Sequence, residues 1–559
     1  MLVLLGKRIA FLSLIGVKGK SLIKMFEKTT DYKTAMKETQ TNSNMTASST
    51  MTVREATRSK TLLLTGATGF LAKVFLERML RSFPEVEKIY LLIRSANQEH
   101  SLDRMELDIF SSSVFQQMKT DDPERFSKVC RDKIRFVSGD HSKPRLGLRP
   151  DEQLRLQAEV DFVVNVAAST DFMDRLDDAV ITNSLSVVNL SEFVRTSKKA
   201  RLLHVSTCYV SESETQNVLE GAPLQPPHAK IKLPWISKSE LDIDKTISQI
   251  SELVESTKMK YEGKPEKQAQ ALVQVGYRFA QDHGWYNIYT FTKWLGERGL
   301  IQEKVKFHCT IVRPSIVGSC MYEPIPGWIE GMKVADPLFY GYAVGLIKSF
   351  PGNAKARFDL IPVDFVSNAM LLALAELAAQ KKPEIKFYQV CSSEENPLTL
   401  AEILRIMRKV YRPGDTSRFF VSKYAFFAVL KSLLFFQGLG FSGLKALKVL
   451  RILPKAQAAV ILKKAKSMQK NLQKLLHFGT IYTPYTNLRC SYDNRQLLDL
   501  HSRAAPEDRV QLPVSARRID WENYLGHVHV PGLIKFVIQA DATTPVAKPK
   551  ESNRRKLAK

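Results

Sequence analysis

Acidic residues are scarce in this sequence. The 57 Asp and Glu residues are outnumbered by 82 Lys and Arg, which gives a formal net charge of +25 at pH 7. From Thr416 to Tyr492 there is no acid at all. A charge of this size indicates an anionic partner, whether nucleic acid, anionic lipid or a small anion such as a nucleotide or coenzyme A, and charge alone does not choose among these classes.

The sequence also lacks closely spaced cysteines and long apolar runs. Its six cysteines are scattered, so neither a zinc site nor a disulfide framework is predicted and no metal is expected. Such thiols are typical of a reducing intracellular compartment. No run reaches the roughly 18 apolar residues of a membrane-spanning helix, so we do not expect the chain to cross a bilayer. The basic N-terminus has no acid before Glu27, and it is open to interpretation as a transit peptide, a weak membrane anchor or a frayed tail.

What the sequence does have is a regular alternation of short apolar runs and helical stretches. This pattern covers residues 60–397 and predicts an α/β fold with a doubly wound, Rossmann-type parallel sheet. Residues 1–59 are interpreted as an N-terminal extension and linker, 398–540 as a smaller, mainly helical and basic C-terminal domain, and 541–559 as a basic tail. The runs expected to form strands are TLLLT, KIYLLIR, KIRFVSGD, DFVVNVAAS, RLLHVSTCYV, CTIVRPSIVG and KFYQVCS.

A glycine-rich turn joins the first apolar run to the first helix. Gly66 and Gly69 are three residues apart, and glycines at this spacing let the backbone approach a pyrophosphate at the amino end of the following helix. The pattern predicts a dinucleotide site, and a tight structural turn is the alternative. The residues of this turn assigned to the cofactor are Thr65, Gly66, Thr68, Gly69, Phe70 and Leu71.

Three residues at later predicted strand ends complete the expected cofactor site. Arg94 follows the second strand, where an NAD-preferring enzyme usually carries an acid, so its guanidinium favours the 2′-phosphate of NADPH. The alternative is a solvated surface arginine. Asp140 is suitably placed for the adenine, and Ala167 for close backbone approach.

The candidate catalytic residues are a phenol, an ammonium and a hydroxyl. Tyr289 and Lys293 are four residues apart and therefore share one face of a predicted helix. We expect Lys293 to lower the pKa of Tyr289, so that the phenol donates a proton near neutral pH, and to hold the cofactor ribose. Thr207 or Ser206, at the end of an apolar run, can hydrogen-bond the substrate oxygen. Together these groups predict acid-assisted hydride transfer.

Two neighbours of these residues have alternative interpretations. The Cys208 thiol would form a thioester if it were a nucleophile, but no base is placed by the sequence to activate it. We therefore expect Cys208 to be a small buried residue with a packing role. His204 is expected to pack within a strand rather than act as a base.

Several stretches resemble the fatty acyl-CoA reductase family, also called the male-sterility family, of the extended short-chain dehydrogenase/reductase type. Two positions depart from the family pattern and leave substrate orientation open: Asn165 stands where relatives often carry His, and Cys208 where Ala is usual. The matching stretches are TGATGFLAKVFLERML, LLIR, NVAASTDF, HVSTCYV, WYNIYTFTKWLGE, IVRPSIVGS, DLIPVDFVSNAML, YQVCSSEENP and DWENYLGHVHVPGL.

The resemblance implies a reductase domain followed by a sterile domain, with NADPH as reductant. It implies that long-chain acyl-CoA is reduced through a bound aldehyde to a primary fatty alcohol, with release of coenzyme A. It favours Thr207 over Ser206, and Arg313 is also assigned to the cofactor. The alternatives are a reductase that releases the aldehyde, an extended dehydrogenase acting on another lipid, and a basic binding protein with an inactive reductase fold.

The acid-free segment predicts contact with an anionic membrane. Its apolar stretches are interrupted by lysines and arginines, which is typical of helices that lie in a lipid surface, although packing on the reductase domain is the alternative. We expect no nucleic-acid partner, and the oligomeric state is not predicted. The expected location is a peripheral site on an intracellular membrane, the endoplasmic reticulum first, with a plastid or mitochondrion as the alternative.

Overall fold

The computed structural model describes residues 52–94, 106–211, 217–221, 243–302, 307–345, 347, 349–411, 420–435 and 455–539. By its contacts the chain divides into two units. We call Met51–Ser422 with Ile481–Lys559 the reductase unit, and Met1–Thr50 with Lys423–Thr480 the basic unit. All the site residues expected above belong to the reductase unit. The domain boundary expected near residue 397 stays a prediction.

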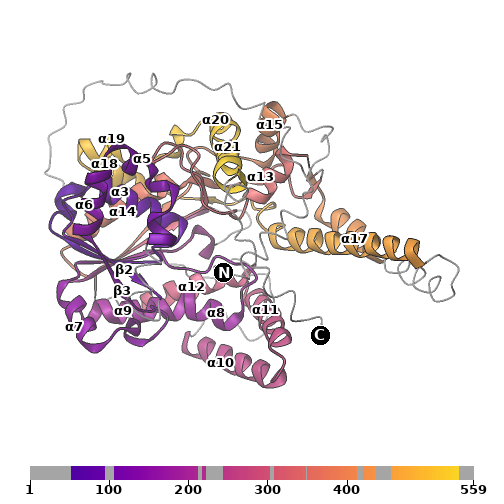
Figure 1. Cartoon of the computed structure of the whole chain (residues 1–559), viewed down its shortest axis with the longest axis horizontal. Coiled ribbons are helices and arrows are strands. Elements are labelled where there is room, and N and C mark those ends of the chain that lie inside the picture. The colour runs from indigo at the N-terminus through magenta and orange to yellow at the C-terminus, as the bar shows by residue number, and fades with distance from the viewer. Residues whose placement is uncertain are drawn as a thin grey trace, which may run out of the picture. The chain divides into compact units, whose positions relative to one another are not determined.

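A seven-stranded parallel sheet forms the centre of the reductase unit (Figure 1). Its order is β11-β7-β5-β4-β1-β2-β3, so the winding direction reverses between β4 and β1. A crevice at such a reversal, at the carboxyl ends of the strands, is where doubly wound folds bind ligands. The expected fold class and seven strands are confirmed: β1 Thr61–Thr65, β2 Lys88–Ile93, β3 Ile134–Ser138, β4 Phe162–Asn165, β5 Arg201–Val205, β7 Cys309–Pro314 and β11 Ile385–Val390.

Helices cover both faces of this sheet. Successive strand residues point to opposite sides, so Leu62 and Leu64 of β1 join one apolar core while Leu63 joins the other. The first core includes α3 (Phe70–Ser82) and α14 (Val363–Ala379), and the second includes α9 (Ser186–Thr196). Because both faces are buried, most of the strands are continuous apolar runs, and β3 at the edge of the sheet is the exception.

The remaining helices of the reductase unit complete these two layers and the C-terminal part. Between β4 and β5 the chain forms α8, a π-helical turn over Ile181–Leu185, and α9. The other helices are α2 Val53–Thr57, α5 Gln116–Asp121, α6 Pro123–Lys133, α7 Pro150–Glu159, α8 Leu176–Val180, α10 Ile243–Lys260, α11 Pro265–Asp282, α12 Ile288–Gln302, α13 Asp336–Ala343, α15 Leu400–Tyr411, α18 Arg495–Arg503, α19 Pro506–Gln511, α20 Trp521–Asn523 and α21 Val530–Leu533.

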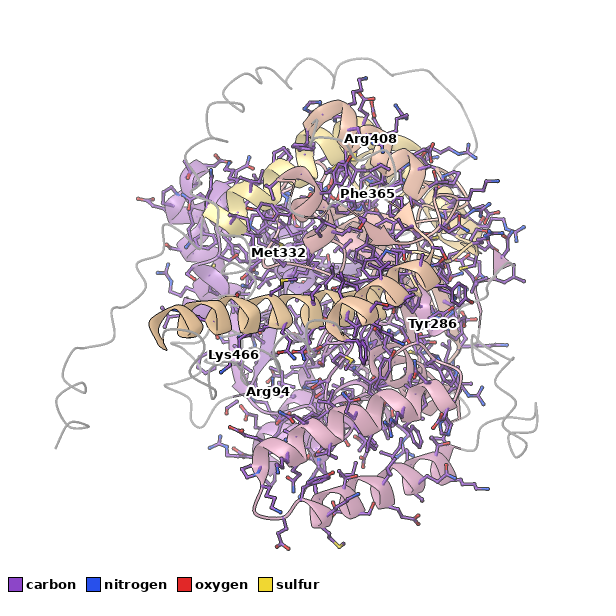
Figure 2. The ribbon with its side chains drawn as sticks, turned by 90° about the vertical axis from the view of Figure 1, so that its right-hand side faces the viewer. Arg94, Tyr286, Met332, Phe365, Arg408 and Lys466 are labelled. Atoms are coloured by element: carbon purple, nitrogen blue, oxygen red, sulfur yellow. The ribbon has the colours of Figure 1, made fainter. Side chains whose placement is uncertain are left out.

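Three small parallel strand pairs join distant parts of the chain. They are β8 Ile316–Gly318 with β10 Leu360–Pro362, β9 Phe350–Pro351 with β12 Phe420–Val421, and β6 Asn217–Val218 with β13 Ser491–Tyr492. The pair β6–β13 ties the chain after residue 481 to the segment that follows β5. Helices α10 and α11, in contact with each other, lie at the lower edge of Figure 1 and Figure 2 and share an apolar core with α12.

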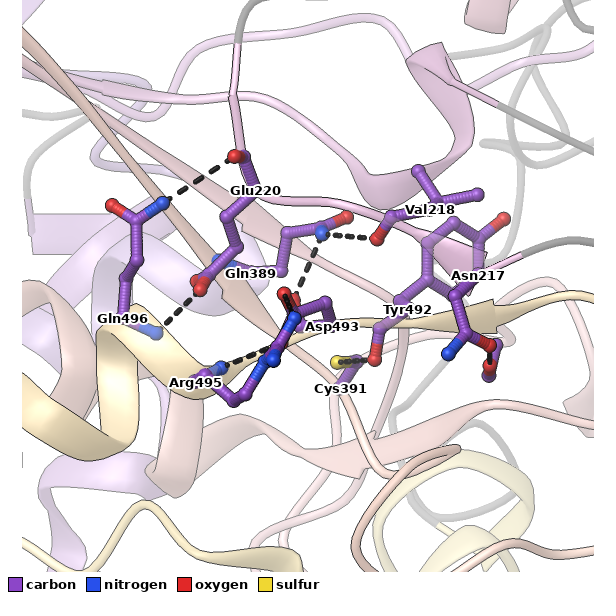
Figure 3. A network of polar contacts seen from close by, with 10 residues as sticks. Asn217, Val218, Glu220, Gln389, Cys391, Tyr492, Asp493, Arg495 and Gln496 are labelled. Carbon is purple, nitrogen blue, oxygen red and sulfur yellow. Dashed lines mark hydrogen bonds and ion pairs between the residues drawn. The ribbon is translucent and has the colours of Figure 1, made fainter.

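A buried polar network extends the contact made by β6 and β13 (Figure 3). The Glu220 carboxylate accepts hydrogen bonds from the backbone N–H groups of Gln389 (2.8 Å) and Gln496 (2.5 Å). The Gln389 amide donates to the carbonyls of Val218 and Asp493, both at 2.9 Å. One carboxylate and one amide therefore link β6, β11 and the start of α18. Burial raises the pKa of Glu220 to about 7, against the lowering effect of these hydrogen bonds.

The basic unit is described here by itself. Its described part consists of a helix over residues 423–435 and most of α17 (Lys455–Tyr482). Phe426 of the first helix is buried and lies against Gly479 of α17. Among the residues that the structure describes, no helix has both the length and the apolar character needed to cross a membrane.

Candidate active site

The predicted dinucleotide turn connects β1 to α3 at the carboxyl edge of the sheet. Gly66 has φ of +70°, and a Cβ added there would lie 2.6 Å from the Ala167 backbone nitrogen. The structure thus brings together Gly66 and Ala167, as expected from the sequence, at the ends of β1 and β4. Gly69 precedes the first residue of α3, and both Thr68 and Gly69 are exposed. Any residue with a side chain at position 66 would collide with the Ala167 backbone and push the turn away from the end of β4.

Thr65 fixes the geometry beneath that turn. Its hydroxyl donates to Asn165 Oδ1 at 2.5 Å, and the Ala167 N–H donates to the same hydroxyl at 3.4 Å. The Asn165 amide in turn contacts His204 Nδ1 at 2.9 Å. Asn165 therefore links the ends of β1, β4 and β5 through its hydrogen bonds.

Arg94 and Asp140 lie at the ends of β2 and β3, the neighbouring strands at this edge. Arg94 is exposed and is labelled in Figure 2. Partial burial opposes ionisation of Asp140, but hydrogen bonds from the Ser142 hydroxyl and N–H, helped by the Arg94 charge, hold its pKa below the ordinary value. Next to it, burial lowers the pKa of His141 to about 4, and the charges of Arg94 and Lys293 add to this lowering. Arg94 at the end of β2 and Lys293 on α12 are thus both close enough to His141 to affect its ionisation.

Tyr289 and Lys293 lie on α12, and Thr207 follows β5. The Lys293 ammonium is buried and donates to the Val205 carbonyl at 2.7 Å. Tyr289 is hydrogen-bonded with the Thr207 side chain. The Thr207 hydroxyl also donates to the Pro314 carbonyl (3.3 Å) and accepts the Tyr209 N–H (3.3 Å), so its position is fixed by three contacts. The phenol, the hydroxyl and the ammonium expected from the sequence converge at the end of β5.

The pKa of Tyr289 differs from the expectation. Burial raises the pKa of Tyr289 to about 12, and the hydrogen bond with Thr207 offsets only part of this. The expectation that Lys293 lowers the pKa of Tyr289 is wrong for this structure, because desolvation outweighs other effects and Lys293 is directed to Val205. Burial also lowers the pKa of Lys293 itself to about 8, although the Glu297 charge opposes the change. Tyr289 is therefore a neutral phenol near pH 7, with a proton to donate.

Ser206, the alternative to Thr207, is differently placed. Its hydroxyl is buried and has no hydrogen-bond partner among the described residues, while its backbone N–H donates to Val312. An unpaired buried hydroxyl is costly, and such groups often mark a position completed by a ligand or water. Of the two hydroxyls, it is Thr207 that contacts Tyr289.

Cys208 and His204 occupy the structural positions expected of them. Cys208 is completely buried, its thiol donates to the Arg313 carbonyl at 2.9 Å, and burial raises its pKa. A thiol kept protonated in this way is a poor nucleophile. His204 is also completely buried, and desolvation keeps its pKa well below the ordinary value.

Arg313, assigned to the cofactor from the sequence, is engaged elsewhere. Its guanidinium is completely buried and forms a bidentate pair with Glu297, donating at 2.9 Å and 2.5 Å. It also donates to the Gly221 carbonyl at 2.7 Å and lies 4.6 Å from the Phe387 ring centroid. This pairing joins β7 to α12, so we correct the assignment of Arg313 from cofactor binding to support of the helix that carries Tyr289.

Two asparagines near the site were not anticipated. Asn183 exchanges hydrogen bonds with the Ser169 backbone and donates to the Thr292 hydroxyl at 3.0 Å, so it ties the segment after β4 to α12. Asn287 caps the first turn of α12 by accepting the Thr290 N–H at 3.0 Å. The cap has a sequence signal, since Asn is favoured before a helix. Asn183 has none, because its partners are distant in the chain.

Comparison with known proteins places this arrangement in a family. The family model described as male sterility protein with a NAD-binding domain matches residues 64–370, and the model for the sterile domain of male sterility protein matches residues 452–540. Fatty acyl-CoA reductase 8 of Arabidopsis thaliana is 30% identical over 86% of this chain and 98% of its own length. The alcohol-forming fatty acyl-CoA reductase of Simmondsia chinensis is also 30% identical, over 86% of this chain and 97% of its own length.

Among solved structures, the terminal reductase domain of the myxalamid biosynthetic pathway is similar in fold. It has a TM-score of 0.51 and 19% identity and covers 85% of this chain and 91% of that domain. The match supports the Rossmann-type reductase fold, and the family models support a nicotinamide cofactor. The resemblance found in the sequence is thereby confirmed, and the chain belongs to the fatty acyl-CoA reductase family of oxidoreductases.

Proposed function

We propose that this protein reduces long-chain fatty acyl-CoA to primary fatty alcohols with NADPH, through an aldehyde that stays bound. The observation that carries the proposal is the convergence of Tyr289, Thr207 and Lys293 beside the Gly66 turn. Membership of a family with an alcohol-forming relative supports the four-electron outcome. An aldehyde-releasing reductase and an extended dehydrogenase acting on another lipid are the alternatives.

The residues at the carboxyl edge fit a nicotinamide dinucleotide. A Cβ at Gly66 would collide with the Ala167 backbone, so only glycine lets this turn pack closely on the end of β4, which supports the compact turn that dinucleotide-binding folds place against a pyrophosphate. The first turn of α3 presents backbone N–H groups beside the exposed Thr68 and Gly69. Exposed Arg94 supports a preference for the 2′-phosphate of NADPH, and the unpaired Ser206 hydroxyl supports a polar ligand nearby.

Bound NADPH would supply the hydride in each of two reductions. The thioester carbonyl oxygen is positioned between the Tyr289 phenol and the Thr207 hydroxyl, which stabilise the negative charge that develops on it. Tyr289 then protonates this oxygen, and the resulting hemithioacetal loses coenzyme A as its C–S bond breaks. After the second reduction Tyr289 again donates the proton, which yields the alcohol. Lys293 would hold the ribose and keep the site cationic, and each acyl chain consumes two hydrides and two protons.

We also propose that the basic unit attaches the enzyme to an anionic membrane surface. The helix over residues 423–435 buries Phe426 and Leu430 but exposes Tyr424, Val429, Leu433 and Phe435, at 77%, 58%, 42% and 64%. Exposed apolar side chains gathered on one helix are typical of helices in a lipid interface.

The charges of the same unit support this surface. Lys463, Lys466 and Lys470 of α17 are exposed and share one helix face by their spacing. Each such cation adds about 1 kcal/mol of attraction to anionic lipid. Lys445, Lys448 and Arg451, which the sequence also indicates, lie outside the described residues. An acyl-CoA is itself amphiphilic, so a surface site at the endoplasmic reticulum is the location we propose, with a plastid or mitochondrion as the alternative.

The experiment that tests the catalytic proposal is a product analysis. The full chain is incubated with a series of acyl-CoAs and with NADPH or NADH, and the products are separated by chain length and oxidation state. We expect primary alcohol, two equivalents of NADPH oxidised per alcohol, and free coenzyme A. Free aldehyde as the final product would favour the alternative reductase, and no product from any acyl-CoA would overturn the proposal.

A further inference from the structure

Tyr485, from the segment that follows α17, contacts the start of the helix that carries Tyr289. The Asn287 side-chain amide donates to the Tyr485 hydroxyl at 2.6 Å, and both side chains are buried. The same amide's oxygen accepts the Thr290 N–H at 3.0 Å. Asn287 thus uses one end of its amide to cap α12 and the other to contact Tyr485, two residues before the proton donor.

A second route from Tyr485 to Tyr289 runs through aromatic rings. Phe172 stacks on Tyr485, with ring centroids 5.3 Å apart and planes at 16°, and lies 5.9 Å from the Tyr289 ring. Tyr485 also meets Tyr209 edge-on at 5.3 Å, and Tyr209 donates its N–H to Thr207. Aromatic pairs at these separations contribute beyond the area they bury. One ring therefore contacts the neighbours of both proposed oxyanion donors.

The backbone around Tyr485 is itself firmly held. The next residue, Thr486, donates its hydroxyl to the Pro351 carbonyl at 2.7 Å and accepts the Asn353 N–H at 2.9 Å. The Arg357 N–H donates to the Leu488 carbonyl at 2.9 Å. These contacts join the segment to β9 and the loop after it. The backbone that carries Tyr485 is therefore held in place by hydrogen bonds on its C-terminal side.

We propose that Tyr485 is a positioning residue, which holds Tyr289 and Thr207 in register for proton donation. The inference rests on the proposed function for its catalytic part. It gives the C-terminal segment a role in catalysis: the reductase fold supplies the reacting groups, and a residue from beyond α17 fixes their separation. Small errors in such a separation cost catalysis heavily, because reacting groups must be aligned to within fractions of an ångström.

The test compares Tyr485→Phe with Tyr411→Phe in the full chain. Both variants remove one phenol hydroxyl from a hydrogen bond, which is buried for Tyr485 and partly buried for Tyr411, since Tyr411 donates to the Gly526 carbonyl at 2.7 Å, away from the site. With palmitoyl-CoA and NADPH, we expect kcat of Tyr485→Phe to fall about tenfold, with KM for NADPH within about twofold of wild type. Tyr411→Phe should leave kcat unchanged, while the two melting temperatures fall by similar amounts.

A double variant separates positioning from a general loss of packing. If Tyr485 acts through Asn287, then Asn287→Ala combined with Tyr485→Phe should lower kcat no further than Asn287→Ala alone, because the two changes break one contact. Full additivity, or a Tyr485→Phe enzyme whose kcat matches that of Tyr411→Phe, would overturn the proposal.

Hydrogen exchange gives a readout that does not need turnover. We expect amides of the first turn of α12, Thr290 above all, to exchange several-fold faster in Tyr485→Phe and at the wild-type rate in Tyr411→Phe. If the wild-type chain reduced no acyl-CoA, the proposed function would fail while this measurement still decided the role of Tyr485. Unchanged exchange at Thr290 would contradict that role.

Discussion

At the scale of single residues, burial decides which groups at the end of β5 carry protons. Tyr289, with a pKa of about 12, is neutral at pH 7, whereas Lys293, with a pKa of about 8, is near the midpoint of its titration under mildly alkaline conditions. The enclosed site thus holds one dependable proton donor and one ammonium whose charge is sensitive to pH.

Removing the phenol should abolish chemistry and spare binding. In Tyr289→Phe the ring and its contact with Phe172 remain, but the proton donor is lost. We expect alcohol formation to fall by about a hundredfold or more, the usual contribution of a general acid, with NADPH affinity nearly unchanged. Turnover is followed by gas chromatography and NADPH binding by fluorescence titration. A variant that kept more than about a tenth of wild-type turnover would exclude Tyr289 as the general acid.

Arg94 should determine the choice between the two nicotinamide cofactors. The guanidinium can pair with a 2′-phosphate that NADH lacks, so Arg94→Ala should raise KM for NADPH about tenfold or more and leave NADH use little changed. Arg149→Ala is a suitable control, because Arg149 is an exposed arginine that pairs with Asp151 on α7. Steady-state kinetics with both cofactors measure the effect, and an unchanged preference would show that Arg94 is only a surface charge.

The ionisation of Lys293 should limit activity at alkaline pH. The charge is present below about 8 and is lost above it, so kcat/KM for NADPH should decline as the pH rises through about 8. Lys293→Ala should remove this decline while lowering kcat/KM at all pH values. A wild-type profile that stayed flat to pH 9 would contradict the assignment.

At the scale of elements, short-range pattern explains what the sequence predicts well. Most of the seven strands are largely buried apolar runs, and the Gly66 turn and the Tyr289–Lys293 spacing are local signals, so each was predicted where it is found. The pKa of Tyr289 and the pairing of Arg313 with Glu297 were not, because desolvation and partner choice depend on residues brought together by folding.

The polar network around Glu220, which links β6, β11 and the start of α18, is another long-range feature. The stability that it gives to the fold should depend on pH. Glu220 is buried, and its folded pKa of about 7 lies above the ordinary value of 4.5. Its contribution to stability is therefore full below about 4.5 and is lost as the pH rises through about 7, by about 3 kcal/mol at most.

Comparing Glu220→Gln with the wild type isolates this effect. Because Gln does not titrate, the wild-type unfolding midpoint should fall relative to that of the variant between pH 5 and pH 8. Differential scanning calorimetry at several pH values measures both midpoints. A constant difference between the two proteins across this range would show that Glu220 ionises normally.

At the scale of the whole molecule, the two units divide the proposed work between chemistry and attachment. The reductase unit contains every site residue, while the described part of the basic unit contains exposed apolar and cationic side chains. Charge of one sign over this part of the chain favours anionic over neutral lipid.

Attachment should be separable from catalysis. We expect the wild-type chain to co-sediment with vesicles containing phosphatidylserine at low salt and to bind phosphatidylcholine vesicles more weakly. Val429→Glu with Leu433→Glu should lower this binding about tenfold or more and leave turnover of soluble acyl-CoA unchanged. Leu154→Glu with Val510→Glu is the matched control, because these apolar side chains are even more exposed than Val429 and Leu433 but lie on the reductase unit. Equal recovery in the supernatant with and without anionic lipid would contradict the proposal.

The contact between Asn287 and Tyr485 also sets an order of events during protein synthesis. Tyr485 follows the proton donor by about 200 residues, so a ribosome adding roughly 5–20 residues per second delivers it about 10–40 seconds after α12. During that interval the central sheet can assemble in full, since β11 ends at Val390, while the cap of α12 lacks its phenol partner. The central sheet should therefore form before the cap of α12 is complete. A ribosome stalled after Val390 has left the exit tunnel, but before Tyr485 is added, should carry a folded, cofactor-binding and catalytically weak chain.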